Sequence, residues 1–335
     1  MSLPPSGEIP QGAIRFNTDS QKLEFYAQGE WWVMSTDTPN LGQATDSTPG
    51  PRGLIGSGSP ATTAIDMINI SSTGSATSFG TLLYGAAYRG GLSSSTRGIF
   101  INGQNDQSVD MVTIASQGNA VTFGEITNDN MGGATYSNST RGYRAGGNDA
   151  GIPSTQIIGM TIASTGSFFD FGTLTASMTY VNGCGSPTRA ITFGGVSPGV
   201  SYHGTIQTHN MSSTGQTQVW GELNTDRKYN AAHSNAIRAF TGMGEGPGST
   251  GLSSMEYINI ASGGNAVDFG DTNSASGNVG SGNCASPTRG IFAGGNTPGF
   301  CDYHNLVTLG DTVTFATLNY HAQYNGQLSN AHGGL

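Results

Sequence analysis

The sequence predicts an all-β protein, built mainly from repeated short strands, with a segment of different pattern in front of the repeats. The 335 residues include 53 glycines, 12 basic and 21 acidic side chains, so charge is sparse and turn-forming glycine is abundant. Short apolar runs alternate with turns rich in Gly and Ser, and no segment has the 3.6-residue apolar period of an amphipathic helix. We therefore expect many short strands joined by tight turns, and very little helix.

Two sets of residues recur at the same spacing, which is the strongest evidence for repeats. Six arginines lie 44 to 51 residues apart, and six aromatic residues lie 44 to 49 residues apart. A glycine follows each arginine by six residues, and another glycine precedes each aromatic residue by five. The agreement predicts six copies of one unit. The recurring residues are Arg52, Arg97, Arg141, Arg189, Arg238 and Arg289, and Phe79, Phe123, Phe171, Trp220, Phe269 and Phe315.

Each unit contains short runs that predict strands. In the second unit these are Arg97–Ile101, Asp110–Ile114 and Ala120–Phe123, and a weaker run such as Ala134–Ser137 comes before each arginine. Three or four strands in a unit of this length is the spacing of a β-propeller blade. The fixed glycines fit tight turns, and the fixed aromatic residue fits packing between blades.

Six units predict six blades, and the end of the chain offers a way to close them into a ring. Residues 319–335 look like the start of another unit, because Leu328–His332 resembles His233–Ile237. This tail would supply a strand to the first blade and remove the open sheet edge. An open stack, such as a β-prism or a β-helix, is the alternative arrangement.

Pairs of adjacent glycines follow the strand that contains the repeat arginine. They are Gly146-Gly147, Gly194-Gly195 and Gly294-Gly295. Together with the late aromatic residue, they resemble the pattern of kelch repeats, in which a double glycine and a late Trp hold these places. The resemblance implies a six-bladed kelch-like β-propeller over residues 39–335.

Residues 1–38 do not follow the repeat. Three short runs, Ala13–Phe16, Lys22–Tyr26 and Glu30–Met34, predict a small β-meander. A sheet of this size cannot bury a core of its own, so its aromatic residues need a partner surface. That surface belongs either to the propeller or to another chain. The residues that we expect to form the anchor are Phe16, Phe25, Tyr26, Trp31 and Trp32.

Two phrases in the sequence resemble virion proteins. The run Gly12–Asp19, followed by Leu23–Tyr26 and Trp31, looks like a short N-terminal module of tailed-phage virion proteins. The phrase Ile162–Gly172 is similar to repeats in structural and fibre proteins of phages that infect marine cyanobacteria. The resemblance implies a component of the tail or capsid surface, made in the host cytoplasm. It also implies that residues 1–38 bind other virion proteins and that the chain forms a homo-oligomer, with a trimer as one option.

The composition and the motifs exclude several classes of function. A net charge of −9 with only two lysines is unsuited to nucleic acid, and no apolar stretch is long enough for membrane insertion. Cys184, Cys284 and Cys301 are odd in number and form no C-x-x-C pair, so we expect free, partly buried thiols. We find no catalytic or metal-binding pattern, and we expect no enzyme, no metal and no cofactor.

Two kinds of residue remain as candidates for binding. The six arginines could form an anion-binding ring, or each could bridge backbone carbonyls of its own or the next blade. Variable loops after the repeat glycine could contact a receptor, and the alternative is ordinary loop packing. The receptor-contact candidates are Tyr202, His203, Asp302, Tyr303 and His304.

These expectations describe a non-enzymatic phage virion structural protein, of the tail-fibre or adhesin type, whose propeller contacts a glycan or protein of the host surface. One alternative is a capsid decoration protein, or knob, without a receptor role. The other is a free carbohydrate-binding propeller.

Overall fold

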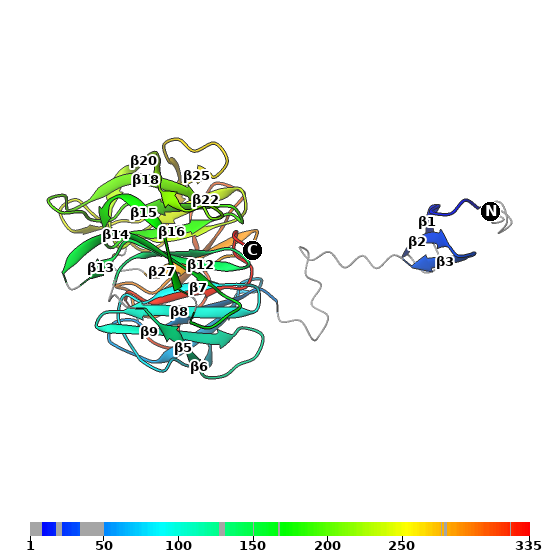
Figure 1. Ribbon diagram of the computed structural model, residues 1–335, viewed down its shortest axis with the longest axis horizontal. Coiled ribbons are helices and arrows are strands. Elements are labelled where there is room, and N and C mark those ends of the chain that lie inside the picture. The colour runs from blue at the N-terminus through cyan, green and yellow to red at the C-terminus, as the bar shows by residue number, and fades with distance from the viewer. Residues whose placement is uncertain are drawn as a thin grey trace. The chain divides into compact units, whose positions relative to one another are not determined.

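The computed structural model describes residues 9–17, 22–33, 50–126, 131–149, 151–166, 168–275, 277, 280–321 and 323–335. These residues form strands and turns and contain no helix, so the expected all-β class is confirmed for them (Figure 1). Accordingly, none of the described segments is a helix that could cross a membrane. The chain divides into two compact units, residues 1–47 and 48–335. The expected boundary between residues 38 and 39 lies outside the described residues.

The first unit contains one antiparallel sheet of three strands. Its strands are β1 (Ile14–Asn17), β2 (Lys22–Ala27) and β3 (Glu30–Val33), in the order β1-β2-β3. The register places Phe25 opposite both Ile14 and Trp32. Because directly opposed residues share a face, these three side chains lie on the same side of the sheet.

The second unit contains six successive sets of strands, paired mostly antiparallel, which we number as repeats 1 to 6 by the order of their arginines. Repeat 1 has β4 (Arg52–Gly56), β5 (Ala64–Asn69) and β6 (Thr77–Thr81); repeat 2 has β7 (Gly90–Ser93), β8 (Arg97–Gly103), β9 (Asp106–Thr113) and β10 (Val121–Glu125); repeat 3 has β11 (Ala134–Ser137), β12 (Arg141–Ala145), β13 (Asn148–Asp149), β14 (Ile152–Thr161) and β15 (Phe168–Met178).

The remaining strands continue this pattern. Repeat 4 has β16 (Asn182–Gly185), β17 (Arg189–Phe193), β18 (His203–Asn210), β19 (Gly215–Gln216) and β20 (Gln218–Arg227); repeat 5 has β21 (Ala231–Ser234), β22 (Arg238–Gly242), β23 (Glu245–Gly246), β24 (Thr250–Gly251), β25 (Ser254–Asn259) and β26 (Val267–Asp271); repeat 6 has β27 (Ser281–Asn283), β28 (Arg289–Ala293), β29 (Cys301–Asn305) and β30 (Val313–Thr314); the last strand is β31 (Gly326–Ser329).

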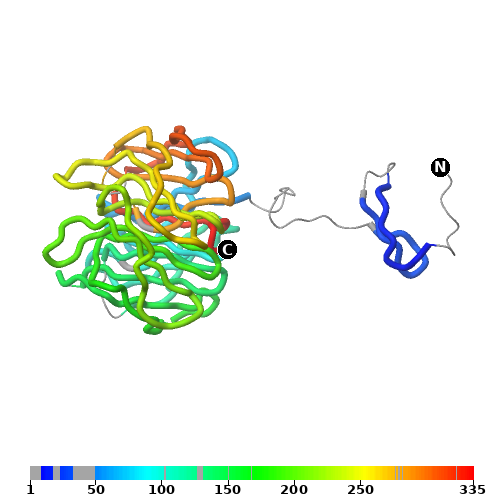
Figure 2. Tube along the Cα trace, turned by 90° about the horizontal axis from the view of Figure 1, so that it is seen from above, coloured from blue at the N-terminus to red at the C-terminus, as the bar shows by residue number. Residues whose placement is uncertain are grey.

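The last strand of the chain belongs to the sheet of the first repeat. β31 pairs antiparallel with β4, and Figure 2 shows the late, orange-to-red part of the chain next to its early blue-to-cyan part. β27 pairs in parallel with both β31 and β7. These pairings join strands of repeats 1, 2 and 6 into one curled nine-stranded sheet, in the order β10-β9-β8-β7-β27-β31-β4-β5-β6.

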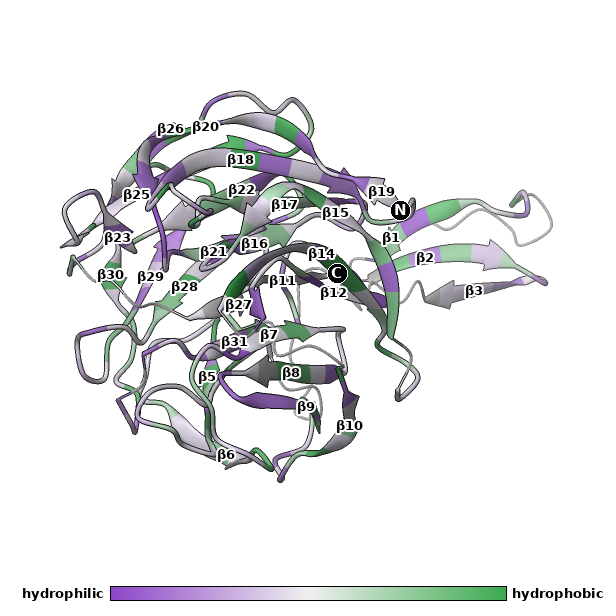
Figure 3. Ribbon diagram, turned by 60° about the vertical axis from the view of Figure 1, so that its left-hand side comes forward, coloured by the Kyte–Doolittle hydropathy of each residue, from purple (hydrophilic) through white to green (hydrophobic). Residues whose placement is uncertain are grey.

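The hydrophobic core lies between neighbouring repeats. In the outer strands β6, β10 and β26 the repeat aromatic residue is the only buried position of five. Figure 3 shows hydrophobic and hydrophilic residues intermixed along the strands of this unit. Phe79 of repeat 1, for example, packs in one cluster with Phe100 and Ile114 of repeat 2. Another cluster combines Ile291 of repeat 6 with Ile55 of repeat 1. Each repeat therefore needs its neighbours to bury its apolar surface.

The recurring glycines allow the repeats to approach closely. A Cβ atom on Gly172 would lie 1.9 Å from the carbonyl oxygen of Gly215 in the next repeat. The glycine five residues before each aromatic residue donates its N–H to the carbonyl of the preceding repeat's aromatic residue in five of the six cases. These hydrogen bonds are Gly118 to Phe79, Gly166 to Phe123, Gly264 to Trp220, Gly310 to Phe269 and Gly74 to Phe315, at 2.9 to 3.3 Å. The last of them joins repeat 1 to repeat 6.

The repeat arginines form a second series of contacts between neighbours. Each donates from Nη1 to a backbone carbonyl of the following repeat, so these groups carry out the carbonyl-bridging role rather than standing free for an anion. The acceptors are Ile114 and Ala115 for Arg52, Ile162 and Ala163 for Arg97, Met211 for Arg141, Ile260 and Ala261 for Arg189, Leu306 and Val307 for Arg238, and Ile70 for Arg289.

A third series uses buried acidic or amide side chains that the sequence analysis did not single out. They lie thirteen residues before the repeat aromatic residue, and each accepts a backbone N–H from the preceding repeat. The pairs are Asp66 with Asn319, Asp110 with Leu83, Gln207 with Thr175, Glu256 with Asn224 and Asp302 with Asn273, at 2.7 to 3.3 Å. In repeat 3 this position is the apolar Ile158, which is 7% exposed.

Candidate functional site: a cluster of four tyrosines

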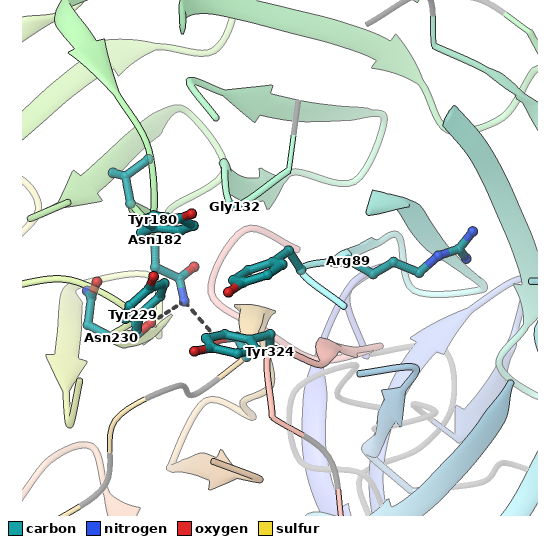
Figure 4. A pocket seen from close by; sticks show the side chains of 10 residues that line it. Arg89, Gly132, Tyr180, Asn182, Tyr229, Asn230 and Tyr324 are labelled. Atoms are coloured by element: carbon teal, nitrogen blue, oxygen red, sulfur yellow. Dashed lines mark hydrogen bonds between the residues drawn. The ribbon is translucent and has the colours of Figure 1, made fainter. Parts of the chain in front are cut away.

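One repeat position brings residues of all six repeats to a single pocket. It lies nine residues before the repeat arginine and holds Tyr88, Gly132, Tyr180, Tyr229 and Gly280 in repeats 2 to 6. Tyr324, two residues before β31, is its counterpart in the first sheet. These six residues line the pocket together with Arg89, Val181, Asn182 and Asn230 (Figure 4). The four aromatic residues are called the tyrosine cluster below.

The four rings of the tyrosine cluster contact one another in a closed circuit. Tyr88 stacks on Tyr324 with ring centroids 4.1 Å apart, and the centroids of Tyr180 and Tyr229 are 4.4 Å apart. The two pairs are joined at 5.5 Å between Tyr88 and Tyr180 and at 5.2 Å between Tyr229 and Tyr324. All four residues are half-buried, so none of them is fully enclosed by the protein.

The tyrosines adopt a backbone conformation that is unfavourable for their residue type. Their φ angles are 62° for Tyr88, 55° for Tyr180, 54° for Tyr229 and 52° for Tyr324. Left-handed φ costs a residue with a Cβ about 1–2 kcal/mol, whereas glycine adopts it freely, as Gly132 does at 68°. Aromatic pairs contribute about 0.5–1.5 kcal/mol beyond their buried area, so ring contacts offset part of this cost. The tyrosine side chain therefore has a role that glycine would not provide.

The floor of the pocket is polar and buried. Asn182 Nδ2 donates to the carbonyl oxygens of Asn230, at 2.8 Å, and of Gly280, at 3.0 Å (Figure 4). Asn230 is 1% exposed, and its Nδ2 donates to Thr241 Oγ1, while its Oδ1 has no hydrogen-bond partner. The cavity measures about 20 Å³, which is room for on the order of one water molecule or one hydroxyl group.

The charge of the one arginine in the pocket is neutralised within the protein. Arg89 is fully buried and forms ion pairs with Asp110, at 2.9 Å, and with Asp106. Burial raises the pKa of Tyr88, and burial together with the neighbouring tyrosines raises the pKa of Tyr229 and Tyr324. These phenols therefore stay neutral at physiological pH and present aromatic faces and hydroxyl groups.

A single ion pair lies at the rim of the cluster. Lys228 Nζ lies 5.1 Å from the ring centroid of Tyr229 and 5.0 Å from that of Tyr202, and it is 3.2 Å from Glu245 Oε1. The Tyr202 hydroxyl donates to the same carboxylate oxygen at 3.0 Å. Although burial alone would raise the pKa of Glu245, hydrogen bonds from Ser249, Lys228 and Tyr202 bring it below its usual value. Tyr202, a predicted contact residue, thus lies beside the tyrosine cluster.

The other predicted receptor contacts are not gathered at this site. His203 is half-buried, and its Nε2 lies 2.6 Å from Ser197 Oγ. Tyr303 lies under the guanidinium group of Arg289, 4.8 Å from ring centroid to Cζ. Asp302 and His304 were expected in a surface loop, but they lie in strand β29 and are each 2% exposed. As receptor contacts they are wrong, because their polar groups are used inside the protein.

His304 instead forms a buried pair with His233. Their Nε2 atoms are 2.6 Å apart, and Phe292 and Phe240 pack against both rings. Burial lowers the pKa of His304 to about 3 and lowers the pKa of His233 well below its usual value. The pair is therefore neutral, and one imidazole donates to the other.

The predicted anchor residues divide between two faces of the N-terminal sheet. Phe16 is 59% exposed and Trp32 is 49% exposed, and they share one face with Ile14, Leu23 and Phe25. This uncharged set of five is called the apolar face below.

The remaining two anchor residues, Tyr26 and Trp31, lie on the other side of the sheet. Tyr26 is 5% exposed, and its ring centroid is 5.3 Å from that of Trp31. The guanidinium group of Arg15 lies 4.1 Å from the Trp31 centroid and pairs with Glu24 at 2.7 Å. Tyr26 and Trp31 therefore pack against each other, with Arg15 against Trp31, within the unit.

The cysteines present no reactive group at the surface. All three are free and buried, and burial raises the pKa of Cys184 and of Cys284 to about 12, so these thiols stay protonated. Within the described part of the chain, no group of three or more His, Cys, Asp or Glu residues is placed to hold a metal ion.

Comparison with known proteins adds no family assignment. The sequence matches no model of a known protein family, and no curated protein is similar to it at a significant level. The tyrosine cluster was missed in the sequence analysis, although a signal was present. Three of its tyrosines lie at the same offset of nine residues before a repeat arginine, and aligning that column would have found them.

Proposed function

We propose that residues 50–335 form a closed six-bladed β-propeller of the kelch-like type, with the repeats as blades. Three contacts support closure between the sixth and the first repeat. Arg289 donates to the Ile70 carbonyl, Gly74 donates to the Phe315 carbonyl, and Asn319 donates to the Asp66 carboxylate. Each belongs to a series that links successive repeats. The pairing of β31 with β4 supports the same arrangement.

We propose further that the protein is a non-enzymatic virion structural protein, in which the N-terminal unit attaches the propeller to a phage particle. The observation that carries this proposal is the apolar face, on which Ile14, Phe16 and Trp32 are 62%, 59% and 49% exposed. Arg15 and Glu24 lie on the other side of the sheet, and Glu30, opposite Ala27, is the charged residue at the end of this side. An exposed apolar cluster of this kind marks a protein interface. Its partner is an apolar surface of another virion protein.

The propeller is then available for contact with the host, as in a tail fibre or adhesin. The resemblance of Gly12–Asp19 and Ile162–Gly172 to phage virion proteins supports this assignment. The buried, protonated cysteines and the buried, neutral histidine pair support a binding role over catalysis, because they offer no exposed nucleophile or base.

Immunogold labelling of intact particles with antibody to residues 50–335 tests this proposal. Gold on the tail, together with loss of adsorption when the antibody is present, supports the adhesin assignment. Gold on the capsid, with adsorption unchanged, supports the decoration protein instead. Particles without gold contradict both virion assignments and leave the free carbohydrate-binding propeller.

A further inference from the structure

We propose that the tyrosine cluster is a saccharide-binding platform, on which one sugar ring of a host-surface glycan stacks. This inference rests on the proposed function, because it identifies the surface with which the propeller would contact the host. Asp302 and His304 are buried and cannot make this contact. The proposed contact lies at the end of the propeller where four rings meet, those of Tyr88, Tyr180, Tyr229 and Tyr324.

The first argument is the backbone strain. Four equivalent positions hold tyrosine at φ of 52° to 62°, where glycine fits without strain and is present at Gly132. If these side chains only filled space, a strained tyrosine would not be required at four equivalent positions of one pocket. Residues held in strained backbone conformations concentrate at functional sites.

The second argument is the chemistry of the surface. The half-buried tyrosines offer aromatic surface, which packs against the C–H groups of a pyranose. Their neutral hydroxyls, which also hydrogen-bond to one another, exchange hydrogen bonds with sugar hydroxyls. Arg89 is paired with two aspartates and Lys228 with Glu245, so neither of these described cations is left unpaired for a phosphate or sulfate group. Because both positive charges are already paired, a neutral sugar fits the site better than an anion does.

The third argument is an unsatisfied buried acceptor in one of the residues of the pocket. Asn230 Oδ1 is buried without a hydrogen-bond partner in a residue that lines the pocket. The cavity of about 20 Å³ admits a hydroxyl group or a water molecule but no sugar ring. The sugar therefore lies across the cluster rather than inside it, and a hydroxyl or a bridging water satisfies Asn230.

Titration of the full-length protein with methyl glycosides of glucose, galactose, mannose, rhamnose and N-acetylglucosamine tests the inference. The readout is the NMR shift of ring-labelled tyrosines. The key variant is Tyr229→Gly, which keeps the backbone conformation because glycine tolerates φ of 54°. The matched control is Tyr84→Ala, because Tyr84 is 61% exposed and lies outside the cluster.

We expect at least one glycoside to shift the cluster resonances, with a Kd that rises about tenfold or more in Tyr229→Gly and stays unchanged in Tyr84→Ala. Tyr229→Phe, which keeps the ring and removes the hydroxyl, should raise the Kd a few-fold. The inference is overturned if no glycoside shifts these resonances, or if Tyr229→Gly binds as the unaltered protein does while both have the same urea midpoint.

This outcome is distinguishable from failure of the proposed function. If gold labels the tail and the antibody blocks adsorption, yet particles with Tyr229→Gly adsorb normally, the virion role stands and the saccharide platform is wrong. If particles carry no gold but a glycoside binds the cluster, the platform stands and the virion role is wrong.

Discussion

Two aromatic residues of the N-terminal sheet are exposed, whereas the phenylalanines at the recurring position of the repeat unit are buried. In the repeat unit the recurring Phe79, Phe123 and Phe269 are 2% to 3% exposed, whereas Phe16 and Trp32 of the N-terminal sheet are 59% and 49% exposed. The repeats cover one another, so each aromatic residue finds a neighbour within the same chain. The three strands of the N-terminal sheet make a single layer, and no further strand among the described residues of their unit covers its apolar face.

Buried charge separates the two regions further. In the repeat unit Arg227 is fully buried and pairs with Glu256, which is 2% exposed. In the N-terminal sheet Arg15, in its pair with Glu24, is still 23% exposed. Substitutions should therefore act on folding in the repeat unit and on association in the N-terminal unit.

The largest effect is expected from Arg227→Met. Burial lowers the pKa of Arg227, and the Glu256 carboxylate acts against that shift. The guanidinium group also donates to the carbonyls of Met243 and Ser254. Removal of one partner of a buried ion pair costs about 3–5 kcal/mol of unfolding free energy. Urea denaturation measures this loss. The double variant Arg227→Met, Glu256→Gln should recover part of it, and the absence of any recovery would show that the ion pair is not the cause.

A second effect is a loss of stability in mild acid. The pKa of His304 is lowered to about 3 by burial, and that of His233 is also lowered, so the unfolded chain takes up protons as the pH falls below about 6.5 and the folded protein does not. The contribution of the neutral pair to the unfolding free energy is therefore fully present above about pH 6.5 and is lost as the pH falls toward the folded pKa. His304 accounts for about 2 kcal/mol of this loss at pH 5, and His233 acts in the same direction.

Urea denaturation at pH 7.5 and pH 5 measures this dependence. His304→Phe should reduce the difference between the two pH values by about 2 kcal/mol. His321→Gln is the control, because His321 is partly exposed and lies outside the pair. An unchanged pH dependence in His304→Phe would contradict the assignment.

A third effect is steric and tests the close contact between repeats. Gly172→Ala would place a Cβ atom 1.9 Å from the Gly215 carbonyl oxygen, so the outer strand must shift. We expect a loss of about 1–3 kcal/mol in the unfolding free energy. Gly74→Ala is the matched control, since a Cβ there has no atom within 4 Å. Equal stability of the two variants would argue against tight packing at this seam.

The smallest effect on folding is expected from Trp32→Ser. Because Trp32 lies on the apolar face, the unfolding free energy of residues 50–335, followed by hydrogen exchange, should change by less than about 0.5 kcal/mol. Incorporation into particles should fall severalfold at the same time. Val121→Ser, which alters a 54% exposed apolar residue of the repeat unit, should leave incorporation unchanged. Normal incorporation of Trp32→Ser would remove the apolar face as the attachment surface.

Much of the strand pattern could be read from the sequence. The weak run Ala134–Ser137 is strand β11, and Arg97–Ile101 lies within β8. Periodicity suffices here, because each strand is short and ends at glycine or at a polar turn. The segment that forms strand β29 was predicted to be a loop because Asp302 and His304 are polar, and this prediction was wrong. Their burial depends on Asn273 and on His233, which lie 29 and 71 residues away.

The amino-acid sequence by itself determined the all-β class, the repeat and the recurring arginine, glycine and aromatic positions, since these depend on local spacing and on side-chain type. Tertiary structure alone decided which polar groups are buried and which tyrosines meet. Tyr88 and Tyr324 are 236 positions apart in the chain and 4.1 Å apart between ring centroids. Such a contact exists only when segments from both ends of the chain lie together. The repeat spacing marks three of the tyrosines as equivalent, but it does not show that their rings meet.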